Sequence, residues 1–156
     1  MASQQRVVIA SGYYDPIHTG HIEYLELAKQ YAVQHDAKLA VIVNNNMQAE
    51  NKKGKPFMCE SERLTIVMAL RCVDIAMISI DNDRSVCESI NKLACDYKVV
   101  AFAKGGDRFA TEVPEAVVCN KYNIPIVDGL GLKIQSSSAL LAAAGDASAP
   151  TPLPKR

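Results

Sequence analysis

Residues 6–21 read Arg-Val-Val-Ile-Ala-Ser-Gly-Tyr-Tyr-Asp-Pro-Ile-His-Thr-Gly-His. The apolar run Val7–Ala10 predicts a short buried strand. Two of the three histidines of the chain, His18 and His21, follow where a helix is expected to begin. A helix N-terminus carries partial positive charge and unpaired N–H groups. Two imidazoles at that place make a compact site for phosphate, so the segment predicts a phosphate site at a strand-to-helix junction.

Apolar runs and helical periods alternate along the rest of the chain. Apolar, β-rich runs predict strands at 6–11, 38–43, 73–80, 98–103 and 125–127. Apolar residues at helical spacing predict helices at 20–34, 60–70, 84–94, 114–122 and 136–144. This alternation predicts an α/β protein with a doubly wound, five-stranded parallel sheet. With strand order 3-2-1-4-5, the loops after the first and fourth strands would meet where ligands bind in such folds.

Composition limits the class of protein. The chain has 156 residues, of which 49% are apolar, and we expect one domain over residues 1–145 followed by a flexible tail at 146–156. Lys+Arg and Asp+Glu balance at 17 each, which argues against binding to nucleic acid or to an anionic membrane. No leader peptide or membrane span is predicted. Five cysteines without a CxxC pair favour buried free thiols, and thus a cytoplasmic protein.

Three further segments carry residues suited to phosphate. Residues 44–58 form a polar loop without periodicity, in which Lys53 or Lys55 would neutralise phosphates, or in which the lysines are simply solvated. Lys-Gly-Gly-Asp-Arg at 104–108 has two glycines that allow a tight turn and close approach of a ligand, as an ordinary loop also would. The serines at 136–138 would cap the last helix, and their hydroxyls suit phosphate too.

The histidine pair by itself leaves other interpretations open. Two incidental histidines near a turn have the same spacing, and a zinc pair would need further His or Cys ligands that the spacing does not supply. In the phosphate interpretation, Gly20 lets the phosphate approach the backbone because it has no Cβ.

Gly-Tyr-Tyr-Asp-Pro-Ile-His-Thr-Gly-His at 12–21 resembles the GxFDxxHxGH signature of the cytidylyltransferase-like nucleotidylyltransferases, with Tyr14 where that family usually has Phe. The lysine loop, Glu-Ser-Glu-Arg at 60–63, Lys-Gly-Gly-Asp at 104–107 and the serine run follow in the family's order. The resemblance implies a Rossmann-like fold. It also implies an enzyme that transfers a nucleoside monophosphate from CTP or ATP to a phosphorylated acceptor, releases pyrophosphate and uses Mg²⁺ bound through the nucleotide phosphates.

The resemblance implies roles for individual residues. His18 and His21 would hold the α- and β-phosphates, and Lys53 would neutralise phosphate charge. Arg63 would face a phosphate, although Glu60 and Arg63 also fit a surface ion pair. Asp15 would order the loop or help to place a metal. The residues expected to contact the nucleotide are Gly12, Tyr13, Tyr14, Asp15, Gly20, Lys55, Lys104, Gly105, Gly106, Asp107, Ser136, Ser137 and Ser138.

The acceptor is less closely defined. Lys-Gly-Gly-Asp resembles the branch that acts on heptose phosphates, and related forms occur in the glycerol-phosphate and ethanolamine-phosphate branches. We therefore expect a small sugar, polyol or amino-alcohol phosphate as acceptor, and a homo-oligomer, most simply a dimer. One alternative is an adenylyltransferase of cofactor synthesis that acts on pantetheine phosphate or on nicotinate or nicotinamide mononucleotide. The other is a non-catalytic nucleotide-binding module.

Overall fold

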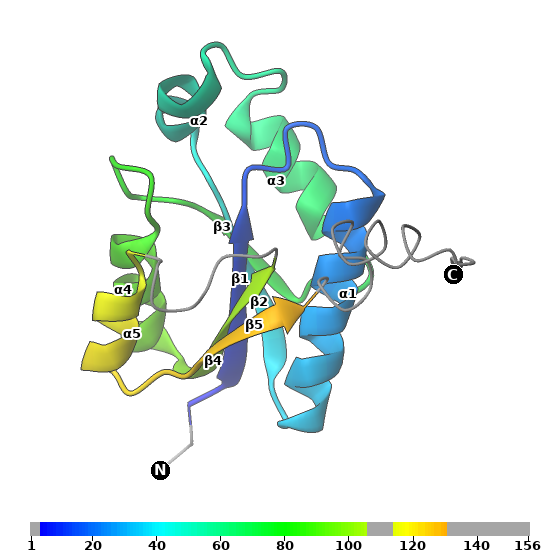
Figure 1. Cartoon of the computed structure of the whole chain (residues 1–156). Helices are drawn as coiled ribbons and strands as arrows, with labels where there is room; N and C mark the ends of the chain where they lie inside the picture. The colour runs from blue at the N-terminus through cyan, green and yellow to red at the C-terminus, as the bar shows by residue number, and fades with distance from the viewer. Residues whose placement is uncertain (1–3, 106–113, 131–156) are drawn as a thin grey trace, which may run out of the picture.

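The computed structural model describes residues 4–105 and 114–130, which form one parallel sheet with helices packed on both faces (Figure 1). The strand order is β3-β2-β1-β4-β5, as the sequence analysis assumed. All four neighbouring strand pairs are parallel, so the predicted doubly wound sheet is confirmed. The strands are β1 (Arg6–Gly12), β2 (Lys38–Val43), β3 (Ile75–Ile78), β4 (Lys98–Gly105) and β5 (Ile126–Leu130).

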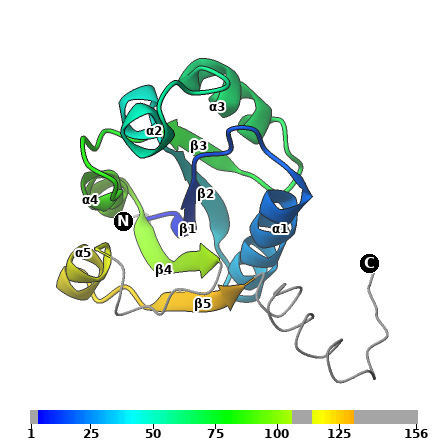
Figure 2. The same ribbon diagram turned by 45° about the horizontal axis from the view of Figure 1, so that its top comes forward.

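The helices divide between the two faces of the sheet, as Figure 2 shows. On one face, α1 and α3 pack against alternate residues of the central strands, among them Val8 and Ala10 of β1. On the other face, α4 and α5 pack against the residues between these, Val7 and Ile9. Strands buried on both faces need continuous apolar runs, which is why Val7–Ala10 is apolar throughout. The helices are α1 (Thr19–Gln34), α2 (Asn46–Lys53), α3 (Glu60–Met68), α4 (Cys87–Asp96) and α5 (Ala116–Lys121).

The third strand and the fourth helix differ from their predicted bounds. The third strand is shorter than the predicted 73–80, and the fourth helix begins three residues later than the predicted 84–94. Residues 79–86 form a polar connection, in which the Asp81 carboxylate accepts the backbone N–H groups of Glu88 and Ser89. These bonds cap α4 from outside the helix, so its first residue cannot be recognised from local spacing. The predicted helix at 136–144 and the tail at 146–156 lie outside the described residues.

The prediction of an unstructured loop over 44–58 is wrong, because α2 occupies the middle of that segment. The Asn45 side chain accepts a hydrogen bond from the Gln48 N–H at 2.9 Å, and the Gln48 side chain accepts one from the Asn45 N–H at 3.0 Å. This reciprocal capping box starts the helix, and Gly54, at φ 88°, ends it. Hydrogen bonds, and not an apolar stripe, fix the position of α2. Hydrophobic periodicity in the sequence therefore gave no signal for this helix.

The side chain of Gln48 also anchors α2 to the rest of the fold. It is fully buried, and its amide nitrogen donates to the carbonyl oxygens of Asp83 and Ser85 at 2.6 and 2.8 Å. Its amide oxygen accepts from the Asn44 side chain as well as from the Asn45 N–H. This one amide therefore joins the end of β2 to the connection between β3 and α4.

Arg63 of α3 makes a second buried junction, and it corrects a predicted role. Its guanidinium is fully buried and donates to the carbonyl oxygens of Tyr13, Asn44 and Met58 at 2.6–2.9 Å and to the Asn46 side chain at 3.1 Å. Four of its five N–H donors are thus used inside the protein. The side chain lines neither of the two cavities described below, and its burial and internal partners do not fit the expected phosphate contact or a surface ion pair. Arg63 positions the loops around the site.

All five cysteines are free thiols, but only Cys119 is buried. Cys59 and Cys95 are exposed, while Cys72 and Cys87 are partly buried, so the expectation of buried thiols is wrong for these four. In the part of the chain that the structure describes, no helix is both long and apolar enough to cross a membrane.

Replacing Gln48 by Ala should lower the free energy of unfolding by about 2–4 kcal/mol, because it leaves buried carbonyl and N–H groups without partners. Urea unfolding followed by circular dichroism measures this change. The control is Gln30→Ala on the exposed side of α1, where we expect a change within about 0.5 kcal/mol. Equal stabilities of the two variants would show that the Gln48 network contributes little.

Arg63→Lys should lower the free energy of unfolding by about 2–4 kcal/mol, since a lysine ammonium cannot reproduce the planar fork that serves three carbonyls. Arg71→Lys, at an exposed position just beyond α3, is the matched control and should leave stability unchanged. If Arg63→Lys instead weakened nucleotide binding without any loss of stability, Arg63 would be a ligand-binding residue.

Candidate functional site

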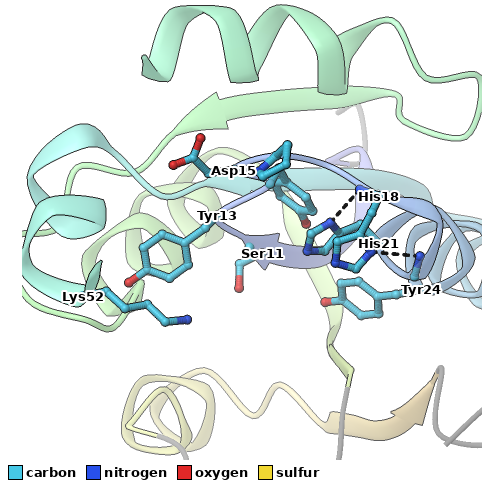
Figure 3. A pocket seen from close by; sticks show the side chains of 11 residues that line it. Ser11, Tyr13, Asp15, His18, His21, Tyr24 and Lys52 are labelled. Carbon is cyan, nitrogen blue, oxygen red and sulfur yellow. Dashed lines mark hydrogen bonds between the residues drawn. The ribbon is translucent and has the colours of Figure 1, made fainter. Parts of the chain in front are cut away.

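The larger of two adjoining cavities opens between the end of β1 and the start of α1, and its volume is about 680 Å³ (Figure 3). Both predicted histidines line it. The other predicted site residues on its wall are Gly12, Tyr13, Tyr14, Asp15 and Gly20. Ser11, Pro16, Tyr24 and Lys52 complete the wall and were not among the predicted residues.

His18 and His21 cap the first turn of α1. His18 is the N-cap residue, and its Nδ1 accepts the Gly20 N–H at 3.1 Å. In return, the His18 N–H donates to Nδ1 of His21, also at 3.1 Å. The two rings stack with centroids 3.9 Å apart and planes 26° from parallel (Figure 3). Two histidines thus form the same reciprocal capping box that Asn45 and Gln48 form in α2.

This capping arrangement fixes the chemistry of both rings. An imidazole nitrogen that accepts a hydrogen bond carries no proton, so the neutral ring holds its proton on Nε2. In this tautomer Nε2 is the donor nitrogen of each ring, and the two rings stack next to the N-terminus of α1. Such a pair suits the oxygens of a phosphate group.

Gly20 is needed here for a reason other than the one expected. A Cβ at this position would lie 3.0 Å from Cε1 and 3.1 Å from Nδ1 of His18. The glycine therefore leaves room for the capping imidazole itself, and a side chain here would push that ring out of place.

The buried Tyr14 ring packs against the histidine pair. Its backbone has φ 55°, its side chain is buried, and its ring meets the His21 ring edge-on at 5.1 Å. A Cβ at Gly12 would come within 2.7 Å of the Tyr14 ring, so Gly12 makes this packing possible. The Tyr14 hydroxyl has no hydrogen-bond partner among the described residues, and burial raises its pKa well above the usual value. The Phe usual in the resembling family would fill this position without that orphaned hydroxyl.

Asp15 holds the segment between α2 and α3. Its two carboxylate oxygens accept the backbone N–H groups of Phe57 and Met58 at 2.8 and 2.7 Å, and the side chain is buried. Of the two roles considered for Asp15, the contacts are those of loop ordering. Among residues 4–105 and 114–130, no group of three or more His, Cys, Asp or Glu side chains is placed to hold a metal ion.

The lysine on the wall of the larger cavity is Lys52, whereas the residues predicted from the sequence were Lys53 and Lys55. The Lys52 ammonium lies 4.4 Å from the centre of the Tyr13 ring. Lys55 is exposed beyond the end of α2 and lines neither cavity, and the side chain of Lys53 lies outside what the structure describes. Once α2 is known to be a helix, Lys52 falls one turn after Gln48, on the side that faces the site.

The smaller cavity, of about 330 Å³, shares Ser11, Gly12, Tyr13, Tyr24 and Lys52 with the larger one. The Tyr24 hydroxyl donates to the Ala103 carbonyl oxygen at 2.6 Å and so ties α1 to β4 where the cavities meet. Burial raises the pKa of Tyr24, against the effect of a backbone hydrogen bond from Ser11. The rest of the smaller cavity is formed by Asn44, Arg84, Val86, Phe102, Ala103, Lys104 and Glu115.

Of the predicted Lys-Gly-Gly-Asp residues, Lys104 lines the smaller cavity and Gly105 ends β4. Strands β1 and β4 are neighbours, so the two glycine-bearing segments do begin at the same edge of the sheet. Gly106 and Asp107 lie outside the described residues, as do Ser136, Ser137 and Ser138.

Comparison with known proteins gives consistent matches. A family model described as cytidylyltransferase-like matches residues 9–128. An FAD synthase from Methanobrevibacter ruminantium is 35% identical over 100 residues, which cover 64% of this chain and 65% of that protein. A second FAD synthase, from Methanocella paludicola, is 32% identical over 67% of this chain and 70% of its own length. The bifunctional protein HldE from Streptomyces coelicolor is 30% identical over 93% of this chain.

The chain spans slightly less than two thirds of the first FAD synthase and only 30% of the HldE protein. Among solved structures, a lipopolysaccharide core biosynthesis protein from Thermoplasma volcanium superposes with a TM-score of 0.62 at 26% identity. That match covers 81% of this chain and 96% of the other. The family model covers more than half of the chain, and the relatives agree with it: the chain belongs to the cytidylyltransferase-like family of nucleotidyltransferases.

Proposed function

We propose that this protein transfers a nucleoside monophosphate from a nucleoside triphosphate to a phosphorylated acceptor and releases pyrophosphate. The observation that carries the proposal is the stacked pair His18 and His21, which line the larger cavity and whose Nδ1 atoms each accept a backbone N–H. Family membership supports the reaction class.

The reaction is a single displacement at phosphorus. An oxygen of the acceptor's phosphate attacks the α-phosphorus and forms a new P–O bond. The bond from the α-phosphorus to the oxygen that bridges to the β-phosphorus breaks, and its electron pair leaves with pyrophosphate. A fully ionised acceptor phosphate is itself the nucleophile, so the step requires no proton transfer. Catalysis then depends on positioning and on stabilising negative charge.

The described residues supply that stabilisation. The Nε2–H groups of His18 and His21 would donate to oxygens of the α- and β-phosphates, where charge grows in the transition state. The N-terminus of α1 adds partial positive charge at the same place. The Lys52 ammonium, on the wall common to both cavities, would neutralise charge between donor and acceptor.

A Mg²⁺ ion fits this arrangement as part of the bound triphosphate. Both oxygens of Asp15 already accept backbone N–H groups, so the phosphates themselves would provide the ion's oxygen ligands. Such an ion would neutralise part of the triphosphate's charge.

For the donor nucleotide we propose ATP rather than CTP. The relatives named FAD synthase make a product that contains an adenylyl group, and they are 35% and 32% identical to this chain. The expectations of a cytoplasmic location and of a homodimer stay predictions.

The sharpest test replaces the histidine cap by the cap that the chain itself uses in α2. The double variant His18→Asn/His21→Gln copies the Asn45/Gln48 box, so it should keep α1 capped and change the free energy of unfolding by no more than about 1 kcal/mol. Because it removes both Nε2–H donors, we expect kcat to fall by a factor of about 10³ or more, with a much smaller change in the Kd for ATP. Pyrophosphate release and calorimetric binding of ATP measure the two effects.

His35→Asn is the matched control, since this third histidine stacks on Tyr31 at the far end of α1. Its kcat should equal that of the wild type. Full activity of the double variant would contradict the proposed role of the histidines. Binding of ATP by the wild type with no pyrophosphate release from any phosphorylated acceptor would instead indicate a nucleotide-binding module.

A further inference from the structure

The smaller cavity differs in character from the histidine cavity beside it. Three cationic side chains line it, Lys52 from α2, Arg84 from the connection between β3 and α4, and Lys104 from β4. The only carboxylate on its described wall is that of Glu115, so the formal charge of these four side chains is +2 (three minus one). Elements distant in sequence thus converge to make a pocket that attracts an anion.

Arg84 is the cationic side chain of this cavity that the proposed nucleotide site does not use. It makes no hydrogen bond or ion pair to the described residues, and its side chain is exposed on the cavity wall. It lies near the Tyr13 phenol: burial raises the pKa of Tyr13, and the Arg84 charge acts in the opposite direction. The Lys52 ammonium lies over the ring of the same tyrosine. Lys52 and Tyr13 line both cavities, and Arg84 lines the smaller one with them.

The N-terminus of α4, which borders the cavity, does not provide the anion site. Its first N–H groups are already bound: that of Val86 by Glu115, that of Cys87 by the Ser85 hydroxyl and those of Glu88 and Ser89 by Asp81. The attraction for an anion therefore comes from side chains. A guanidinium is well suited to it, because its parallel N–H groups match two phosphate oxygens.

Glu115 gives the cavity a second kind of contact. One carboxylate oxygen, Oε2, accepts the Val86 N–H at 2.9 Å, which fixes the side chain on the wall. A carboxylate only accepts hydrogen bonds, so its partner in a ligand would be a hydroxyl or an ammonium group and not a second anion.

We propose that the smaller cavity is the acceptor subsite, in which Arg84 and Lys52 bind the acceptor's phosphate and Glu115 accepts hydrogen bonds from the hydroxyls of a polyol or sugar phosphate. This inference rests on the proposed function, because it places the acceptor relative to a nucleotide in the histidine cavity. It makes Arg84 a residue that determines the acceptor and not the nucleotide.

The test measures pyrophosphate release from ATP with glycerol 3-phosphate, glucose 1-phosphate or FMN as acceptor. Each of these acceptors carries a phosphate and hydroxyl groups, and the wild type should use at least one of them. Arg84→Gln should raise the KM for the acceptor about 10- to 100-fold, the loss expected for charge-assisted hydrogen bonds. The calorimetric Kd for ATP should change less than about threefold. Arg84→Lys should recover part of the loss, and the exposed control Arg71→Gln should match the wild type.

Two results would overturn the inference while leaving the proposed function intact. They are an unchanged acceptor KM in Arg84→Gln and a weakened ATP affinity in place of a weakened acceptor affinity. The absence of pyrophosphate release from the wild type with every acceptor in the panel would contradict the proposed function itself, and the acceptor subsite with it.

Discussion

The buried guanidinium of Arg63 fixes the edge of the sheet on which the site is built. Parallel strands end in carbonyl groups that no further strand satisfies, and buried carbonyls need donors. Arg63 supplies them to Tyr13 after β1, to Asn44 after β2 and to Met58 in the segment before α3. A buried charge is costly unless its hydrogen bonds are satisfied, and here four donors are. As a result the histidine segment and the segment between α2 and α3, which Asp15 also holds, keep a fixed relation to one another.

On that support, one set of atoms serves both folding and chemistry. The N-cap residue of a helix is usually Ser, Thr, Asp or Asn, and α2 has Asn45 at this position. In α1 two imidazoles cap the helix through Nδ1, so that Nε2 is the donor nitrogen of each neutral ring. The histidine cap also explains two neighbouring residues. Gly20 leaves space for the His18 ring, and the Tyr14 ring packs against that of His21. Stability and catalysis can be separated only by a substitution that keeps the cap and removes the donor.

The sequence was most informative where a pattern is local and repeated. Apolar runs such as Val7–Ala10 identified buried strands, and the alternation of elements predicted the sheet whose order brings β1 and β4 together. It was least informative where long-range polar contacts decide the structure. The helix that carries Lys52 is held by the Gln48 amide and not by an apolar stripe, so the helix was missed, and Lys53 and Lys55 were predicted in place of Lys52. Arg63 was assigned to a phosphate because its burial among backbone carbonyls has no signature in local sequence. Arg84 and Glu115 enter the smaller cavity only through the tertiary fold.

The most direct measurement of the central claim is the tautomer of each histidine, read from long-range ¹H–¹⁵N correlation spectra of the labelled protein in alkaline buffer. The structure predicts the Nε2–H form for His18 and His21, because Nδ1 of each accepts a backbone N–H. His35 is an internal reference for the opposite form, since its Nδ1 lies 2.8 Å from the Tyr31 carbonyl oxygen, which can only accept. Finding Nδ1–H on His18 or His21 would contradict the account, because the ring would then lack the acceptor that caps α1 and the Nε2 donor assigned to phosphate.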